Sequence, residues 1–282
     1  MSVNLKDTLV VLGGDDAEMT TIRTLLSHFG IRWVQPNKGW GDHIYNPEQV
    51  GLKMKEISGM TPKPTPEGKT RPQQSPEGVE HVIFVECRPG DGWCETGEMT
   101  VIDHHGDRSG EQSSILQLIW AFQNCWGWMS PSLQRWTELI AANDQGYIPA
   151  LQAFGATPDE IDRIRRLDRQ AQGITTAHEA EAERAIGAKE IDGRLTIVRM
   201  DHSKTATVAD RLFGQHDQLL ILSGDGEANF YGDGALCAEL KTRFEGWCGG
   251  AGLGKAGSNA FWGGGYPKHD ELLSFIKTQL SQ

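Results

Sequence analysis

The first half of the chain alternates short apolar runs with segments of helical spacing, and this alternation constrains its fold more than any other feature. The apolar runs have the length of buried strands and end in glycine or in polar residues. Strands that alternate with helices are typical of a mainly parallel sheet covered by helices on both faces. The predicted strands are residues 8–13, 31–34, 81–86 and 99–102, and the predicted helices are residues 18–29, 47–57, 111–124 and 131–143.

The second half returns to an α/β pattern after a charged segment. Residues 157–190 combine helical spacing with many charges, which indicates a helical linker. Beyond it, predicted strands cover residues 195–200, 218–222 and 228–231. We therefore predict an α/β domain at residues 1–156, a helical linker at 157–190 and a smaller α/β domain at 191–282. Residues 61–78 are rich in proline and polar side chains, which predicts an exposed loop, either a disordered insertion or a lid.

The composition narrows the setting in which the chain works. No run approaches the roughly 18 to 20 apolar residues needed to cross a bilayer, and residues 1–7 lack the apolar core of a signal peptide. Five scattered cysteines without a Cys-x-x-Cys pair indicate free thiols in a reducing compartment. We therefore expect a cytoplasmic protein with no membrane partner, and the sequence also allows a homodimer.

The net charge of −11 disfavours one class of partner. Long nucleic acids are bound by rows of Lys and Arg that displace counterions, and the acidic balance of this chain argues against such a groove. A short nucleotide held by a metal site is still compatible, because a bound cation reverses the local charge.

The sequence Val-Ile-Asp-His-His-Gly at residues 101–106 is the strongest local motif. It carries Asp103, His104 and His105 directly after a predicted buried strand, where open α/β sheets bind ligands. Imidazole and carboxylate groups together suit manganese, zinc or iron, and an aspartate can orient a neighbouring histidine ligand. The motif therefore predicts a metal site, with a purely structural histidine pair as the alternative.

Further acidic side chains follow other predicted elements. They are Asp15, Asp16 and Glu18 after the first strand, Glu86 at the end of residues 81–86, and Asp144 in the sequence Ala-Ala-Asn-Asp-Gln-Gly at residues 141–146. Such a set could hold two divalent ions about 3.5–4 Å apart, which would clamp a phosphoryl centre and activate a bridging water. Each also has an ordinary reading: a helix cap for Asp15 or Asp16, a surface residue for Glu86 and a turn residue for Asp144. Their convergence on one edge of one sheet favours function.

These motifs resemble the DHH phosphoesterase superfamily, which includes manganese-dependent pyrophosphatases, RecJ-like exonucleases, oligoribonucleases and cyclic dinucleotide phosphodiesterases. The resemblance covers most of the chain in order and spacing, and residues 101–106 match almost literally. It implies an N-terminal domain with four metal-binding motifs, a helical linker and a smaller substrate domain. It also implies roles for seven residues: metal ligation by Asp16, Glu18, Glu86, His104 and Asp144, contact with the scissile phosphate by His105, and support from Asp103.

The chain departs from the family pattern in its first motif, His-x-x-x-Asp-x-Asp. Aligning Asp16 and Glu18 with the two aspartates puts Leu12 where the family has histidine, and Glu86 replaces the second-motif aspartate. The number of bound metals, one or two, therefore stays open. Asp15 or the pair Asp42-His43 could compensate, although a solvated loop is the plainer interpretation of that pair.

A glycine-rich segment near the C-terminus resembles the family's substrate-binding stretch, although the family histidine is absent from it. Glycine lets backbone N–H groups approach an anion closely, and the alternative is a glycine loop without a ligand. The tryptophans that flank the segment, Trp247 and Trp262, could stack on a base or pack in the core. The predicted substrate-binding residues are Gly249, Gly250, Lys255, Asn259, Gly264 and Gly265, with Ser258 as a further candidate.

These observations predict a manganese-dependent phosphoesterase that hydrolyses a small nucleotide phosphodiester, either a short oligonucleotide or a nucleotide second messenger. A pyrophosphatase-like enzyme is one alternative, although such sites gather several Lys and Arg residues. A non-catalytic nucleotide-binding protein on a degenerate DHH scaffold is the other, and the missing first-motif histidine supports it.

Overall fold

A computed structural model describes residues 7–36, 41–44, 54–56, 63–64, 70–71, 74–76, 78–90, 98–122, 129–265 and 268–281. The chain divides into two compact units, Met1–Gln172 and Gly173–Gln282. The segment predicted as a linker supplies one helix to each: α4 (Pro158–Ala171) to the first unit and α5 (Thr176–Gly187) to the second. The described cysteines, Cys87, Cys237 and Cys248, are free thiols.

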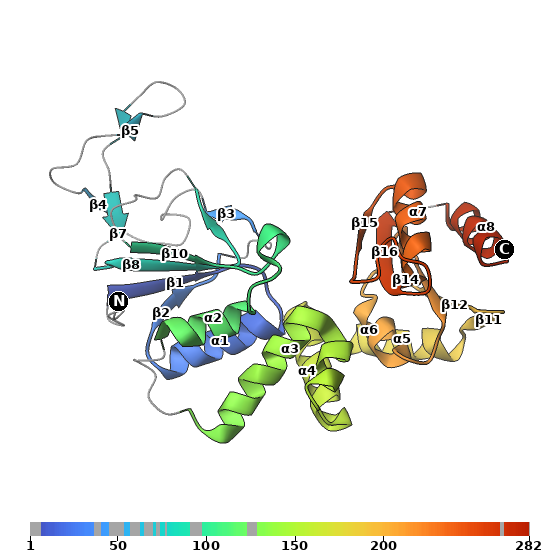
Figure 1. Ribbon diagram of the computed structural model, residues 1–282, viewed down its shortest axis with the longest axis horizontal. Coiled ribbons are helices and arrows are strands. Elements are labelled where there is room, and N and C mark those ends of the chain that lie inside the picture. Colours follow the sequence, from blue (N-terminus) through green and yellow to red (C-terminus); the bar gives the residue numbers. More distant parts are fainter. Residues whose placement is uncertain are drawn as a thin grey trace. The chain divides into compact units, whose positions relative to one another are not determined.

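The first unit is built on a four-stranded parallel sheet, which confirms the predicted α/β class (Figure 1). Its strand order is β10-β8-β1-β2, so the first strand of the chain lies inside the sheet. The strands are β1 (Thr8–Leu12), β2 (Arg32–Val34), β8 (His81–Val85) and β10 (Glu98–Ile102). The parallel registers pair Leu12 with Val85 and Val85 with Ile102, which aligns the carboxyl ends of three strands at one edge.

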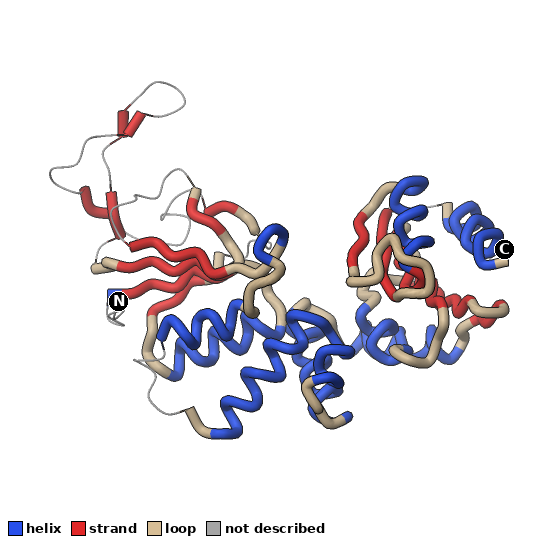
Figure 2. The backbone as a smooth tube through the Cα atoms, viewed as in Figure 1, coloured by secondary structure: helices blue, strands red, loops and turns tan. Residues whose placement is uncertain are grey.

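The helices of this unit gather on one face of the sheet, as the tube drawing also makes visible (Figure 2). They are α1 (Ala17–His28), α2 (Ser114–Phe122), α3 (Pro131–Ala153) and α4. Alternate strand residues such as Val10 and Leu12 pack against them, whereas Leu9 and Val11 point to the other face. That second face packs on Ile44, Val79 and Cys87. The expected helices on both faces are therefore not found among the described residues, where β3 (His43–Ile44) and the segment around Val79 take their place.

The second unit has a six-stranded mixed sheet in the order β11-β12-β13-β14-β16-β15. Its strands are β11 (Glu190–Asp192), β12 (Leu195–Met200), β13 (Gln218–Ser223), β14 (Glu227–Asp233), β15 (Trp247–Gly249) and β16 (Asn259–Gly265). One face packs on α7 (Gly234–Phe244) and α8 (His269–Leu280) around the fully buried Trp262. The other face packs on α5 and α6 (Ala206–Leu212), over β12 and β13.

Several predicted boundaries differ from those observed. Of the helix predicted at 47–57, only Met54–Glu56 lies within the described residues, and it forms strand β4. The segment 61–78, predicted as a loop, contains short strands where it is described: β5 (Lys63–Pro64) pairs with β6 (Thr70–Arg71), and β7 (Gln74–Pro76) pairs with β4. The glycine-rich segment ends in strand β16 rather than in a loop.

None of the helices that the structure describes combines the length and the hydropathy that a transmembrane span needs.

Candidate metal centre

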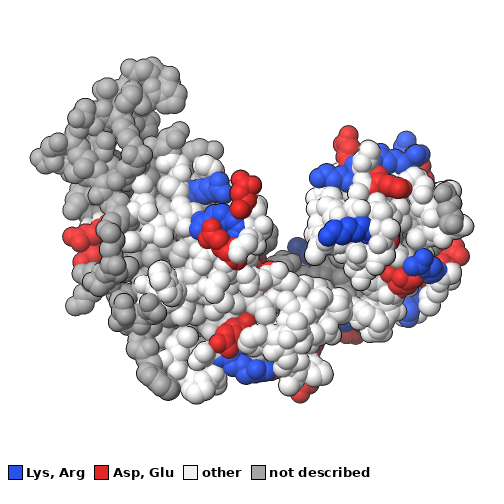
Figure 3. Space-filling view, in the orientation of Figure 1, with Lys and Arg blue, Asp and Glu red and all other residues white. Residues whose placement is uncertain are grey.

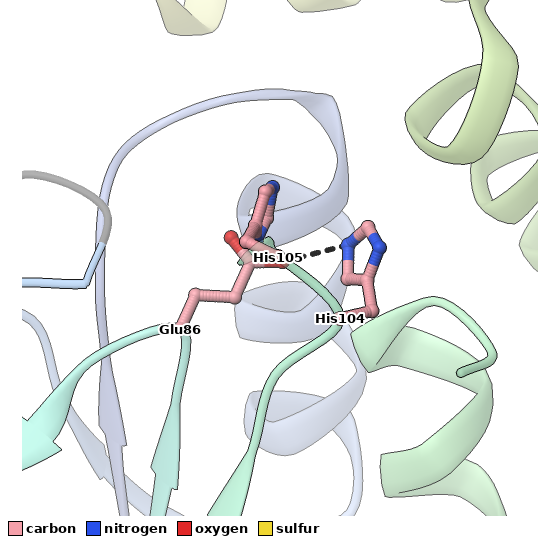
Figure 4. A group of neighbouring side chains, drawn as sticks. All are labelled: Glu86, His104 and His105. Atoms are coloured by element: carbon pink, nitrogen blue, oxygen red, sulfur yellow. Dashed lines mark ion pairs between the residues drawn. The ribbon is translucent and has the colours of Figure 1, made fainter. Parts of the chain in front are cut away.

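Four ligand groups meet at the carboxyl edge of the parallel sheet. Glu86 follows β8, His104 follows β10, Glu18 lies in the first turn of α1, and Asp144 projects from α3. One ligand atom from each of these four lies within 4.8 Å of all the others. A second, overlapping group consists of Glu86, His104 and His105 (Figure 4). Four of the five residues that the sequence analysis proposed as metal ligands therefore lie together, although they come from four separate segments, whereas Asp16 is not in this group.

Atoms at the centre of the cluster approach closely without forming hydrogen bonds. His104 Nε2 lies 2.7 Å from Asp144 Oδ2 and 3.2 Å from Glu86 Oε1. These atoms, together with Glu86 Oε2 and Glu18 Oε2, are buried and have no hydrogen-bond partner of acceptable geometry. Buried polar atoms in proteins almost always have a partner, and leaving them without one costs free energy. A cation shared by these atoms would satisfy all of them, so the residues present fit a divalent metal ion.

The electrostatics of the cluster also favour a cation. Burial raises the pKa of Glu18 well above its usual range, and the charges of Asp144 and Glu86 raise it further. Burial likewise raises the pKa of Asp144, and it raises the pKa of Asp16 to about 7. These shifts mean that several carboxylates resist ionisation together in the metal-free protein. A divalent ion would restore their charged forms.

His104 balances part of this charge in the metal-free protein. Burial lowers its pKa, but contacts with Asp144 and Glu86 outweigh that effect and raise the pKa to about 10. For Glu86, burial raises the pKa, while the close contacts with His104 and Glu18 and the nearby charges of His105 and His104 leave it lowered. A histidine ligates a metal ion in its neutral imidazole form, so metal binding at this site displaces a proton from His104.

The backbone around Glu86 is strained, with a φ of +53° at this non-glycine residue. Such a conformation costs on the order of 1–3 kcal/mol and is commonly found at functional sites. The Glu86 carbonyl packs so closely on Gly13 that a Cβ at Gly13 would lie 2.5 Å from its oxygen. The glycine after β1 therefore leaves room for the conformation that aims Glu86 into the cluster.

Asp103 and His105 form a separate pair at the rim of the cluster. Asp103 Oδ1 accepts hydrogen bonds from the backbone N–H of His105 at 3.0 Å and from its ring Nδ1 at 3.1 Å. Burial raises the pKa of Asp103, but these hydrogen bonds leave it lowered, so the carboxylate is ionised. The His105 side chain is 49% exposed, whereas that of His104 is 7% exposed. Asp103 thus orients His105, the histidine that faces solvent.

The remaining acidic candidates have other partners. Asp16 caps α1, because its Oδ1 accepts from the Met19 backbone N–H at 2.8 Å. It is still close enough for Glu86 and Asp144 to raise its pKa. Asp15 pairs with Arg23 at 3.1 Å. Among the described residues, neither Asp15 nor the Asp42-His43 pair belongs to a metal-competent group, and Leu12 is fully buried in the core.

A buried ion pair on α4 supports two of the metal-binding segments, and the sequence analysis missed it. Asp168 Oδ1 accepts from the Ala17 backbone N–H at 3.1 Å, which fixes the start of α1. Asp168 Oδ2 accepts from Arg165 at 2.8 Å, and Arg165 also donates to Asn143, the neighbour of Asp144, at 2.9 Å. The charged pattern of 157–190 indicated a helical linker. Its only hint of this role was the spacing of Arg165 and Asp168, three residues apart on one helix face.

α3 changes direction immediately after Asp144. Gly146 and Tyr147 have non-helical backbone angles, and Tyr147 has a φ of +57°. The Arg165 guanidinium lies 4.4 Å from the centre of the Tyr147 ring, which ties this kink to α4. The sequence predicted a helix end near residue 143, but the helix resumes and ends at Ala153.

In the second unit, the predicted substrate-binding glycines lie mostly in strands. Gly264 and Gly265 of β16 pair with β14, and Gly249 of β15 pairs with β16. Gly250 has a φ of +100° just after β15, and Asn259 is the first residue of β16. Lys255 Nζ donates to the Ala251 carbonyl at 3.3 Å. The expected glycine loop is therefore partly a strand pair, whose ladder already engages backbone groups of these glycines.

Aromatic rings occupy the side-chain space at two positions of this strand pair, which explains why glycine occurs there. A Cβ at Gly249 would lie 2.7 Å from the Phe261 ring, and one at Gly263 would lie 2.6 Å from the Trp247 ring. Trp247 and Phe261 are 48% and 39% exposed, and both rings lie on the same face of the sheet. Trp262 is instead a core residue, whose indole donates to the Glu245 carbonyl at 2.7 Å. Of the two tryptophans predicted as base-stacking candidates, only Trp247 is accessible.

Comparisons with known proteins give only weak likenesses. No protein-family model matches the chain, and no curated protein matches it. Among solved structures, the pGpG-specific phosphodiesterase PggH from Vibrio cholerae is similar over 97% of this chain and 99% of its own, with 11% identity and a TM-score of 0.42. RecJ from Thermus thermophilus in complex with Mg²⁺ is similar over 91% of this chain and 47% of its own, with 12% identity and a TM-score of 0.44.

A third structure, an uncharacterized protein from Helicobacter pylori, is similar over 96% of this chain and 98% of its own, with 8% identity and a TM-score of 0.27. Likenesses this low in sequence and in backbone geometry do not assign the chain to a family.

We expect the free energy of unfolding of the metal-free protein to decrease as the pH rises from about 4 to about 7. Burial raises the pKa of Asp16 from 3.8 to about 7, so in this window the unfolded state releases its proton while the folded state retains it. The loss amounts to at most about 4 kcal/mol. Asp16→Asn, which can still cap α1, should make the pH dependence shallower in urea unfolding with a chelator present. Asp15→Asn is the control, and equal slopes for D16N and the wild type would contradict the assignment.

We expect Asp168→Ala to destabilise the first unit by about 3–5 kcal/mol, because it leaves Arg165 buried without its carboxylate. Asp162→Ala on the same helix removes an exposed pair with Arg166 and should cost less than about 1 kcal/mol. Urea unfolding of both variants measures the difference. Equal costs would show that the buried pair does not hold α1 and α3 in place.

Proposed function

We propose that this protein is a metal-dependent phosphoesterase and that its first unit carries the reaction centre. The observation that supports this most strongly is the convergence of Glu18, Glu86, His104 and Asp144, whose buried ligand atoms lack hydrogen-bond partners. Carboxylate and imidazole ligands together suit manganese, whereas thiolate ligands favour softer metals. Asp16 lies beside these residues and is the candidate for a further ligand.

A divalent ion held by these residues would lower the pKa of a coordinated water and offset charge on phosphoryl oxygens. The chain's own contribution begins with Asp103, which keeps Nδ1 of His105 engaged and leaves Nε2 available. When protonated, His105 donates from Nε2 to a phosphoryl oxygen and stabilises the charge that develops there. Glu86, fixed by its strained backbone, keeps its carboxylate directed at His104 and His105 rather than at solvent.

The proposed substrate is a small nucleotide phosphodiester, such as a short oligonucleotide or a nucleotide second messenger. The net charge of −11 argues against long nucleic acids. On the face drawn in Figure 3, the described Lys and Arg side chains are interspersed with acidic ones instead of forming a row. A compact substrate bound through a metal ion needs no such row.

We assign substrate recognition to the second unit. Trp247 and Phe261 are exposed aromatic residues, and base stacking on aromatic rings stabilises binding by about 1–3 kcal/mol per base. Lys255 and Asn259 could add polar contacts. The glycines at 249, 250, 264 and 265 lie in or directly beside the strand pair that carries these two rings.

A non-catalytic nucleotide-binding protein is the second candidate. The observation that favours it is Leu12, which is buried in the core where the resemblance leads one to expect a histidine ligand. A pyrophosphatase-like activity has less support, because such a site gathers several Lys and Arg side chains around a compact polyanion.

Hydrolysis of linear dinucleotides, cyclic dinucleotides and pyrophosphate, with Mn²⁺ and with chelator, tests the proposal. We expect Mn²⁺-dependent release of mononucleotides. His104→Ala and Asp144→Ala should each lower turnover more than about 100-fold, because even residues that only support metal ligands contribute 10- to 100-fold. Asp15→Asn should retain activity, since Asp15 pairs with Arg23 outside the cluster.

Two outcomes would count against the proposal. Full turnover in both H104A and D144A would rule out this metal centre as the reaction site. Absence of turnover for every substrate, in protein that binds nucleotide, would favour the non-catalytic candidate.

A further inference from the structure

Arg88 places a cation at the rim of the metal centre, close to Asp103. It lies two residues after Glu86 in β9 (Arg88–Pro89), which pairs with β3. Its backbone N–H donates to the Asp42 carbonyl at 3.0 Å, which anchors the main chain while the side chain remains 52% exposed. The guanidinium is therefore accessible from solvent next to the ligand cluster.

Asp103 connects Arg88 with His105. Its Oδ1 is engaged by His105, whereas its Oδ2 lies 3.6 Å from Nη2 of Arg88. At that distance the carboxylate attracts the guanidinium without forming a close hydrogen bond. One buried carboxylate thus holds two half-exposed groups, an arginine and a histidine, beside the metal centre. The Arg88 guanidinium retains N–H donors toward solvent, and Nδ1 is the ring nitrogen of His105 that Asp103 engages.

Other described arginines around the centre are already committed. Arg108 donates from Nε and Nη2 to the two carboxylate oxygens of Glu111, both at 2.7 Å, and from Nη1 to the Val101 carbonyl. Arg165 is buried with Asp168 and Asn143. Arg88 differs because its contact with Asp103 exceeds hydrogen-bond distance, so its fork of donors can engage a ligand without breaking a close pair.

The charge balance of the centre calls for such a group. Asp16, Glu18, Glu86 and Asp144 carry four negative charges when ionised, which two divalent ions would only neutralise. Asp103 and an incoming phosphodiester each add a further negative charge. An arginine presents paired N–H donors that match two phosphoryl oxygens and remains charged throughout the physiological pH range.

We propose that Arg88 binds the phosphoryl oxygens of the substrate, alongside His105, and that Asp103 positions both side chains. The inference rests on the proposed function in one respect, namely that the phosphate bound by Arg88 belongs to the substrate. The anion site itself requires only the loaded metal centre and can therefore be tested without turnover.

The test uses inorganic phosphate as the probe on the full chain loaded with Mg²⁺, followed by ³¹P NMR titration. We expect Arg88→Gln to weaken phosphate binding about 10- to 100-fold, because it removes a charge-assisted pair of hydrogen bonds. Arg88→Lys should retain the charge and give an intermediate loss. Arg166→Ala is the matched control, since Arg166 belongs to the same unit, is 58% exposed and pairs with Asp162. Its phosphate affinity should equal that of the wild type.

Two further measurements separate substrate binding from a structural role. Metal affinity and melting temperature should be unchanged in R88Q, and methylguanidinium in the buffer should restore part of its phosphate binding. Wild-type phosphate affinity in R88Q would overturn the proposal, as would equal losses of metal and phosphate affinity. If the wild type hydrolyses no phosphodiester, but R88Q still loses phosphate binding, the Arg88 site stands and the proposed function fails.

Discussion

The buried carboxylates of Glu18 and Glu86 and the carboxylate of Asp144, whose side chain is 12% exposed, gather around His104, and much of the first unit holds them together. Carboxylates removed from water repel one another and are costly to ionise. The raised pKa of Glu18 and Asp144 expresses that cost, and the raised pKa of His104 expresses the partial compensation. Such a cluster lowers the stability of the folded protein, so stability alone does not explain its presence. The same cost is offset when the cluster binds a divalent cation.

The surrounding fold supports this convergence through specific contacts. The parallel registers of β1, β8 and β10 align three carboxyl ends, so that side chains after each strand meet at one edge. Gly13 leaves space for the unusual backbone of Glu86. The Asp168–Arg165 pair reaches from α4 to the start of α1 and to Asn143, and it thereby links the segments that carry Glu18 and Asp144. Helix α4, which the sequence analysis predicted as part of a helical linker, supports the site through this pair.

Glu86 and His104 were predictable as neighbours because each follows an apolar run that indicates a buried strand, whereas Glu18 and Asp144 lie in helices. Asp103, His104 and Glu86 stand directly after such runs, and strand ends in a parallel sheet share an edge. The role of Arg165 and Asp168 was not predictable, because charges on a helix usually face solvent and only tertiary packing distinguishes the exceptions. The strands of the glycine-rich segment were not predicted for a related reason. Glycine predicts a loop, but Gly249 and Gly263 occur in strands where the rings of Phe261 and Trp247 occupy the space of a side chain.

Anomalous diffraction at the manganese edge, from crystals grown with Mn²⁺, tests the central claim most directly. We predict an anomalous peak at coordination distance, about 2.0–2.6 Å, from Glu86, His104 and Asp144, with Glu18 beside it. A second peak near Asp16 would establish a two-metal centre, and a single peak would establish a one-metal centre. A well-ordered cluster without any anomalous peak at saturating Mn²⁺ would contradict the account.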